Sequence, residues 1–136
     1  MTAKEYLSRY LVAKREIDIL LDRRQQLWDM MTKVTPTLQA DRVQGGQPAK
    51  TDEIIAVYRD VEDEIFTKIK SLVIIMRDIE RVIDLVSNDR QRDVLKLRYI
   101  NGLKWEEIAV KLMLDYRWVL RLHGKALQSL TIESHY

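Results

Sequence analysis

The stretch RYINGLKWEEIAVKLMLDYRWVL, residues 98–120, decides how the C-terminal part of this chain folds. Asn101 and Gly102 form a dipeptide that is typical of a tight turn. Apolar residues then recur at helical spacing over about 104–112, and Asp115 is placed to cap a further helix. The stretch therefore predicts two short helices joined by a turn.

A third short helix ends within the first residues of this stretch, and the three helices share one apolar interior. Ser87 or Asn88 ends the preceding helix and caps a segment over about 89–100. The last helix spans about 115–130. The predicted inward positions are Val94, Leu95, Tyr99, Ile108, Ala109, Leu112, Leu114, Val119, Leu122, Ala126, Leu127 and Leu130. Residues 87–136 are thus predicted to form a three-helix domain.

A long helix is predicted at the N-terminus, over about 3–33. This segment contains no Gly or Pro, and Thr2 offers an N-cap. Alternating steps of three and four residues give an apolar seam of the coiled-coil kind. The seam consists of Tyr6, Tyr10, Ala13, Ile17, Leu20, Arg24, Leu27, Met31 and Val34.

A second long helix is predicted over about 51–86, after a flexible loop at 35–50 that holds both prolines of the chain. The residues Thr51, Asp52 and Glu53 offer a cap and first-turn acids. The seam consists of Ile54, Tyr58, Val61, Ile65, Lys68, Leu72, Ile75, Ile79, Val82 and Val86. The apolar stripe widens to include Ile69, Val73, Ile74, Met76 and Ile83, which indicates more than one packing partner.

The two matched seams predict that the long helices fold back as an antiparallel, coiled-coil-like hairpin over residues 1–86. Each seam has one basic interruption, Arg24 and Lys68. Such residues either set the register or oligomeric state, or extend along the apolar surface to solvent. The expected fold is therefore all-α, with the hairpin followed by the three-helix domain of residues 87–136.

Composition argues against several classes of protein. The 136-residue chain has no Cys, which excludes disulfides and thiolate metal sites. Its longest apolar run, about SLVIIM, is far too short for a membrane span, and the N-terminus lacks the apolar core of an export signal. No phosphate loop, nucleophile motif or metal-spaced cluster is present. We therefore expect a cytoplasmic protein without a cofactor, a metal, enzymatic activity or membrane contact.

Charge is unevenly distributed along the chain. Residues 87–136 carry nine Lys and Arg against six Asp and Glu, whereas residues 51–86 carry five against nine. A basic C-terminal third permits contact with nucleic acid without requiring it.

Residues 90–130 resemble region 4 of the sigma-70 family of bacterial RNA polymerase sigma factors. The matching pieces are R-x-V-L-x-L-R-Y (92–99), G-L-x-W-E-E-I-A (102–109) and K-A-L-x-x-L (125–130). The whole layout also resembles small phage-encoded regulators of the ArpU type, which join a helical N-terminus to such a region. The resemblance implies a helix-turn-helix whose last helix enters the major groove of duplex DNA, in the cytoplasm of a bacterial host.

This placement makes the outward side chains of the last helix candidates for contact with DNA. Arg117 and Arg121 share one helix face and are suited to guanine edges or phosphates, and Lys125 is suited to phosphate. The candidate DNA-binding residues are Tyr116, Arg117, Arg121, Lys125, Lys104 and Lys111, with Arg98 as a further candidate for the DNA backbone. The alternative is that these charges form a solvated face.

Several residues depart from the pattern of a DNA-reading helix. Met113 stands where the turn usually has Gly, and because a left-handed backbone costs a non-Gly residue about 1–2 kcal/mol, a different turn geometry is expected. Trp118 and Leu120 are expected to lie beside each other on the outward face, and two large apolar groups side by side more often mark a protein contact. Gly124 weakens the middle of the last helix. The alternative interpretation is that its lack of a side chain permits close approach of DNA or of a partner helix.

Three functional hypotheses follow. The leading one is a phage or prophage transcriptional regulator that binds duplex DNA and uses the hairpin for homodimerisation or contact with RNA polymerase. The alternative is a protein-interaction module that binds polymerase or another regulator through Trp118 and Leu120, without direct DNA readout. The third is a structural helical protein in which the basic face is incidental.

Overall fold

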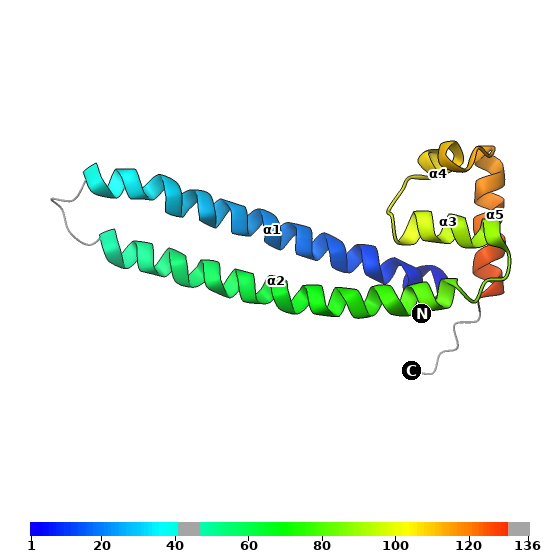
Figure 1. Ribbon diagram of the computed structural model, residues 1–136, viewed down its shortest axis with the longest axis horizontal. Coiled ribbons are helices and arrows are strands. Elements are labelled where there is room, and N and C mark those ends of the chain that lie inside the picture. The colour runs from blue at the N-terminus through cyan, green and yellow to red at the C-terminus, as the bar shows by residue number, and fades with distance from the viewer. Residues whose placement is uncertain (41–46, 131–136) are drawn as a thin grey trace. The chain divides into compact units, whose positions relative to one another are not determined.

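The computed structural model describes the backbone of residues 1–40 and 47–130, and the side chains of residues 1–33 and 51–130. All regular structure in these residues is α-helical, which confirms the predicted all-α fold with a hairpin followed by shorter helices (Figure 1). The helices are α1 (Ala3–Ala40), α2 (Gln47–Ile83), α3 (Asp89–Tyr99), α4 (Trp105–Leu112) and α5 (Tyr116–Ser129).

Both long helices extend into the segment that was predicted as a loop. α1 continues to Ala40, past Pro36, although a proline cannot donate a backbone hydrogen bond there. α2 begins at Gln47, so Pro48 lies in its first turn, where the backbone N–H has no intrahelical partner and proline is tolerated. The predicted cap at Thr51 is therefore wrong, because Thr51 lies inside α2. The rest of the predicted loop, residues 41–46, lies outside the described residues.

The chain divides into two compact units, and α1 and α2 contribute to both. Residues 15–71 form one, which we call the hairpin unit. Residues 1–14 together with 72–136 form the other, which we call the composite unit. The sequence placed a domain boundary between residues 86 and 87, whereas these units divide within the two long helices.

The hairpin unit holds its two helices antiparallel through an apolar seam and two ion pairs. Leu20, Val61 and Ile65 are buried together, as the seams predicted. The two basic interruptions of the seams pair across it: the Lys68 ammonium lies 3.5 Å from a Glu16 oxygen, and the Arg24 guanidinium lies 3.9 Å from a Glu62 oxygen. Because these ion pairs are half-exposed, each stabilises the fold little. Both join α1 to α2, and the later residue of α1 pairs with the earlier residue of α2, as an antiparallel arrangement requires.

The composite unit joins the first turns of α1 and the last turns of α2 to the three short helices. Its first core cluster contains Leu7, Ile79, Ile83, Val86, Leu95, Tyr99 and Ala126, so α1, α2, α3 and α5 all contribute to it. Leu7 and Ile79 have no exposed surface. The cap predicted at Thr2 is present, since the Thr2 hydroxyl accepts a hydrogen bond from the Glu5 backbone N–H at 3.1 Å.

The wide apolar stripe predicted on α2 is only partly buried. Ile83 is fully buried in the first core cluster of the composite unit. Ile69, Val73 and Ile74 are exposed, and so is Phe66, which the sequence did not single out.

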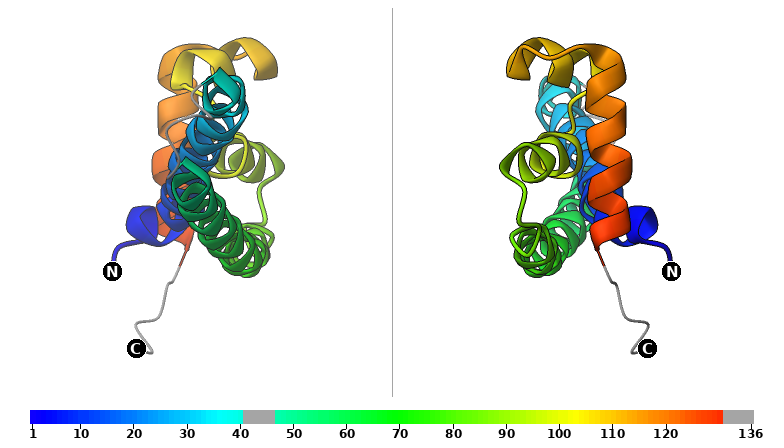
Figure 2. Two further views of the ribbon diagram at one scale, coloured as in Figure 1. Left: turned by 90° about the vertical axis from the view of Figure 1, so that its left-hand side faces the viewer. Right: turned by 90° about the vertical axis from the view of Figure 1, so that its right-hand side faces the viewer.

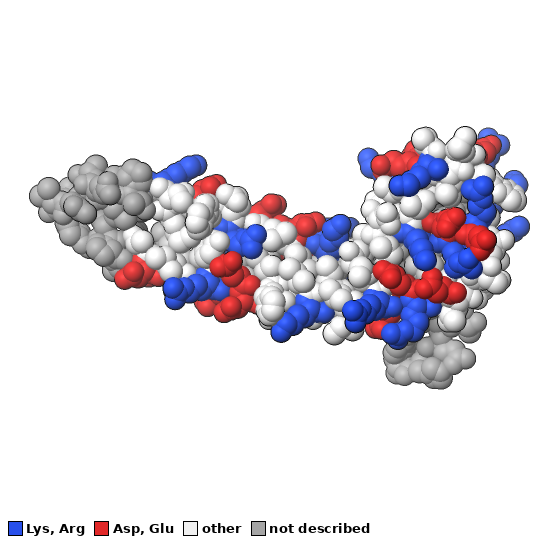
Figure 3. All heavy atoms as spheres, viewed as in Figure 1, with Lys and Arg blue, Asp and Glu red and all other residues white. Residues whose placement is uncertain are grey.

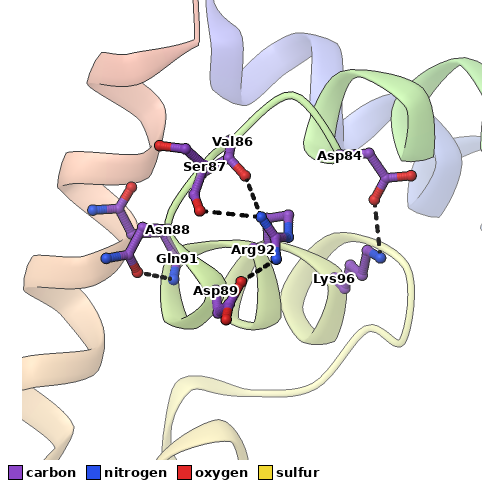
Figure 4. Close-up of polar contacts among 8 residues, drawn as sticks. All are labelled: Asp84, Val86, Ser87, Asn88, Asp89, Gln91, Arg92 and Lys96. Carbon is purple, nitrogen blue, oxygen red and sulfur yellow. Dashed lines mark hydrogen bonds and ion pairs between the residues drawn. The ribbon is translucent and has the colours of Figure 1, made fainter.

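The connection from α2 to α3 is held by side chains that bond to the backbone (Figure 4). The Arg92 guanidinium donates to the carbonyl oxygens of Val86 at 2.7 Å and Ser87 at 3.2 Å, and it also contacts Asp89. The Asn88 side chain accepts the Gln91 backbone N–H at 3.0 Å, which confirms Asn88 as the cap of α3. A further ion pair of 3.0 Å joins Lys96 of α3 to Asp84, just after α2. Two side chains of α3, Arg92 and Lys96, thus bind the segment that follows α2.

Candidate nucleic-acid interface

The three short helices pack around a second core cluster in the composite unit. This cluster contains Val94, Ile108, Ala109, Val119 and Leu122, all of which were predicted to face inward. Leu112 and Leu114 pack at its edge. In this packing, α4 lies across the N-terminal end of α5, and one long side of α5 is covered by neither α3 nor α4 (Figure 2).

The turn between α4 and α5 has the left-handed geometry that usually calls for Gly. Met113 has φ 57° and ψ 44°, and its side chain is 90% exposed. The Leu114 backbone N–H reaches back to the Ala109 carbonyl at 3.0 Å, which closes the end of α4 as in a Schellman motif. The expectation of a different turn geometry is therefore wrong, because this hydrogen bond and the packing of Leu114 hold the turn despite the local cost.

Replacing Met113 with Gly is expected to raise the free energy of unfolding by about 0.5–1 kcal/mol. Glycine removes the steric cost of the left-handed backbone, and its greater freedom in the unfolded chain offsets part of that gain. Urea denaturation of the two proteins measures the difference. Met113→Ala is the control, because alanine keeps the same backbone cost, and it should leave the stability nearly unchanged. A destabilised Met113→Gly protein would contradict the assignment of a strained residue here.

The exposed side of α5 carries three basic side chains in one line. Arg117, Arg121 and Lys125 are spaced four residues apart, so they follow one face of the helix, and all three are exposed. Within residues 1–33 and 51–130, none of them forms an ion pair, and α5 contains no acidic residue. Figure 3 shows basic side chains projecting at the edge of the composite unit where α5 runs. We call these three residues the basic face of α5.

The N-terminal end of α5 is fixed by the predicted cap. The Asp115 carboxylate accepts the Arg117 backbone N–H at 3.1 Å, so the cap lies directly beside the first residue of the basic face. Tyr116, also predicted to contact DNA, is the first residue of α5 and is exposed. The Asp115 cap therefore holds Arg117 on a well-defined first helical turn.

The candidate residues outside α5 have different surroundings. Lys104 precedes α4, and its side chain is exposed while its backbone N–H donates to Glu107 at 3.0 Å. Lys111 is exposed near the end of α4, in a shallow hollow that it shares with Glu106 and Glu107. Those carboxylates make Lys111 less suited to a phosphate than the basic face, which has no acid on its helix.

Arg98, a further candidate for the DNA backbone, is instead used within the fold. Its guanidinium lies over the Trp105 ring, 4.3 Å from the centroid, and donates to the Leu103 carbonyl at 3.0 Å.

Gly102, which has φ 72°, makes the turn between α3 and α4 that the Asn101–Gly102 dipeptide predicted.

Trp118 and Leu120 are exposed by 42% and 37%, but they do not form one apolar patch. Residues two apart on a helix point about 200° away from each other, so the two side chains lie on opposite edges of the basic face. The expectation that they lie beside each other is therefore wrong. The Lys125 ammonium lies 5.7 Å from the centroid of the Trp118 ring, which places Trp118 on the Lys125 side of this face.

His123 joins the three short helices through an aromatic cluster that the sequence did not indicate. The Tyr99 hydroxyl of α3 and Nε2 of His123 form a hydrogen bond of 2.7 Å, and the Trp105 ring of α4 meets the imidazole at an edge, with 4.5 Å between centroids. Burial, followed by the nearby charges of Lys4 and Arg98, lowers the pKa of His123 to about 4. His123 is therefore neutral in the folded protein at pH 7.

Because its pKa is lowered on folding, His123 is expected to make the protein less stable in mild acid. The unfolded chain binds a proton near pH 6.5, whereas the folded protein resists protonation until about pH 4, so stability falls as the pH falls between these values. Because the imidazole is only partly buried, we expect its contribution to be a loss of about 1–2 kcal/mol between pH 7 and pH 4.5.

Urea denaturation at several pH values tests this expectation. His123→Phe should remove this part of the pH dependence while keeping an aromatic ring against Trp105. The stability of the wild type relative to His123→Phe should therefore fall as the pH falls from 7 to 4.5, and identical slopes would exclude the role given to His123.

The family DUF1492, described as a protein of unknown function, matches residues 32–131, which is more than half of the chain. The chain belongs to the DUF1492 family. The DUF1492 match includes α2 to α5 but not the first turns of α1, which complete the composite unit here. No curated protein and no solved structure was found to match the chain.

The described residues contain neither a membrane-spanning helix nor a cluster suited to a metal ion. None of the helices there has the length and apolar character needed to cross a membrane. That part of the chain also contains no group of three or more His, Asp or Glu arranged to hold a metal ion.

Proposed function

We propose that this protein is a non-enzymatic transcriptional regulator, phage or prophage encoded, that binds duplex DNA with α5. The basic face of α5 carries this proposal, because its three exposed cations lie in one line and form no ion pair with any residue that the structure describes. The proposal also draws on the resemblance of residues 90–130 to region 4 of sigma-70 factors, in which α4 and α5 correspond to the helix-turn-helix.

The dimensions of the basic face suit the major groove. An α-helix with its side chains is about 10–12 Å across, which the major groove, about 12 Å wide, admits, and at about 1.5 Å per residue the basic face extends roughly 12 Å along the axis from Arg117 to Lys125. Arg117 and Arg121, near the N-terminal end of α5, are positioned for base edges, where a guanidinium bonds to guanine through two N–H groups. Lys125, further along, is positioned for a phosphate.

A homodimer would give this interface a second copy of α5 and therefore a second half-site. The hairpin unit supports this part of the proposal, since Phe66 and Ile69 are exposed apolar residues three positions apart on α2. Exposed apolar groups of this size gain by burial against another chain.

Equilibrium binding to a mixed-sequence duplex at increasing salt tests the proposed function. We expect binding at low salt that weakens linearly on a log–log scale, because each phosphate contact releases counterions. A protein that fails to bind any duplex even at the lowest salt would exclude DNA binding.

A second candidate function is protein binding by the same helix, and the exposure of Trp118 and Leu120 favours it. RNA polymerase is the partner that the sigma-factor resemblance indicates. Capture of polymerase by the immobilised protein separates the two functions: if Trp118→Ala abolishes capture while Arg121→Ala leaves promoter output unchanged, the protein-binding function replaces the DNA-binding one.

A further inference from the structure

Gly124 lies inside α5 at a position where the fold does not require glycine. A Cβ added at Gly124 would meet no atom within 4 Å, so no neighbouring side chain or backbone excludes a larger residue. Its backbone is also ordinary, because the only glycine with positive φ among the described residues is Gly102. Glycine in a helix interior lowers helix stability, and neither packing nor backbone conformation requires it here.

The position of Gly124 on α5 indicates which surface its bare backbone belongs to. It follows Arg121 by three residues and Arg117 by seven, so it lies on the same side of the helix as both. It also directly precedes Lys125. The bare backbone at Gly124 is therefore bordered by the cations of the basic face, which attract an anionic ligand.

We propose that Gly124 is a positioning residue that lets α5 lie directly against the sugar-phosphate backbone of duplex DNA. This inference rests on the proposed function and specifies how α5 meets its ligand. A side chain at this position would add roughly 1.5 Å of bulk between the helix and the DNA. Since Arg117 and Arg121 bond over short distances, such a displacement weakens their contacts with the groove.

Gly124→Ala in the full chain tests the inference, with fluorescence anisotropy on a labelled mixed-sequence duplex at low salt. We expect the melting temperature to stay the same or rise, since alanine favours a helix and meets no neighbour. We also expect the affinity for duplex DNA to fall by at least about ten-fold, the loss that follows from weakening one good base or phosphate contact.

Thr67→Ala is the matched control, because it also raises helix propensity but lies on α2. It should leave DNA affinity unchanged. Wild-type affinity in Gly124→Ala would overturn the inference while leaving the proposed function in place. A fall in melting temperature would overturn it too, because the glycine would then serve the fold. Absence of binding by the wild type removes the proposed function and the inference together.

Discussion

Replacing Leu7 with Ala is expected to lower the free energy of unfolding by about 2–5 kcal/mol. Leu7 has no exposed surface and packs with Ile79 of α2, Leu95 of α3 and Ala126 of α5. Truncating it leaves a cavity where these helices meet, and surroundings that are already closely packed relax only in part. Urea denaturation followed by circular dichroism measures the loss.

Val12→Ala provides the control for this experiment. Val12 lies on the same helix and in the same unit, but it is 48% exposed, so its truncation should cost well under half as much. Equal effects of Leu7→Ala and Val12→Ala would contradict the placement of the first turns of α1 in the core of the composite unit.

The double substitution Arg117→Ala and Arg121→Ala is expected to lower the affinity for duplex DNA by at least roughly 30-fold. Each Arg that contacts a base edge contributes about 1–3 kcal/mol, and two such losses multiply in the binding constant. Neither side chain forms an ion pair among the described residues, so the fold should keep its stability. Anisotropy titrations at one fixed low salt concentration measure the change.

A charge-matched control separates site-specific contact from general attraction. Arg15 and Arg23 are exposed on α1 in the hairpin unit, and Arg15→Ala with Arg23→Ala removes the same net charge. This control should bind nearly as the wild type does. If both double variants lose affinity equally, the basic face of α5 has no special part in binding.

The sequence was sufficient for the elements whose pattern is local. The periodic positions of the short helices identified the second core cluster, including Val119 and Ile108, because burial on one helix face leaves a direct trace in the sequence. Asp115 was predicted as a cap for the same reason, since capping depends on residues a few positions apart, and the cap of α3 was narrowed to Ser87 or Asn88, of which Asn88 is the one observed.

The sequence was insufficient where the outcome depends on which distant segments meet. Leu7 lies off the seam that starts at Tyr6, and a pattern along one helix does not reveal that its first turns pack against α3 and α5. His123 likewise gives no signal by itself, because its partners Tyr99 and Trp105 lie on other helices.

The candidate interface shows both cases. Its basic face followed from the spacing of Arg117, Arg121 and Lys125. The left-handed backbone at Met113 could not be predicted from the sequence. Its local steric cost is outweighed by the hydrogen bond from the Leu114 backbone N–H to the Ala109 carbonyl and by the packing of Leu114.

Hydrogen–deuterium exchange with and without a duplex tests most directly whether α5 is the surface that meets DNA. At a salt concentration where the duplex is bound, we predict slower exchange in α5, over Tyr116–Ser129, and no change over residues 15–33 of the hairpin unit. Bound duplex without any protection in α5, or with protection confined to the hairpin unit, would contradict the account.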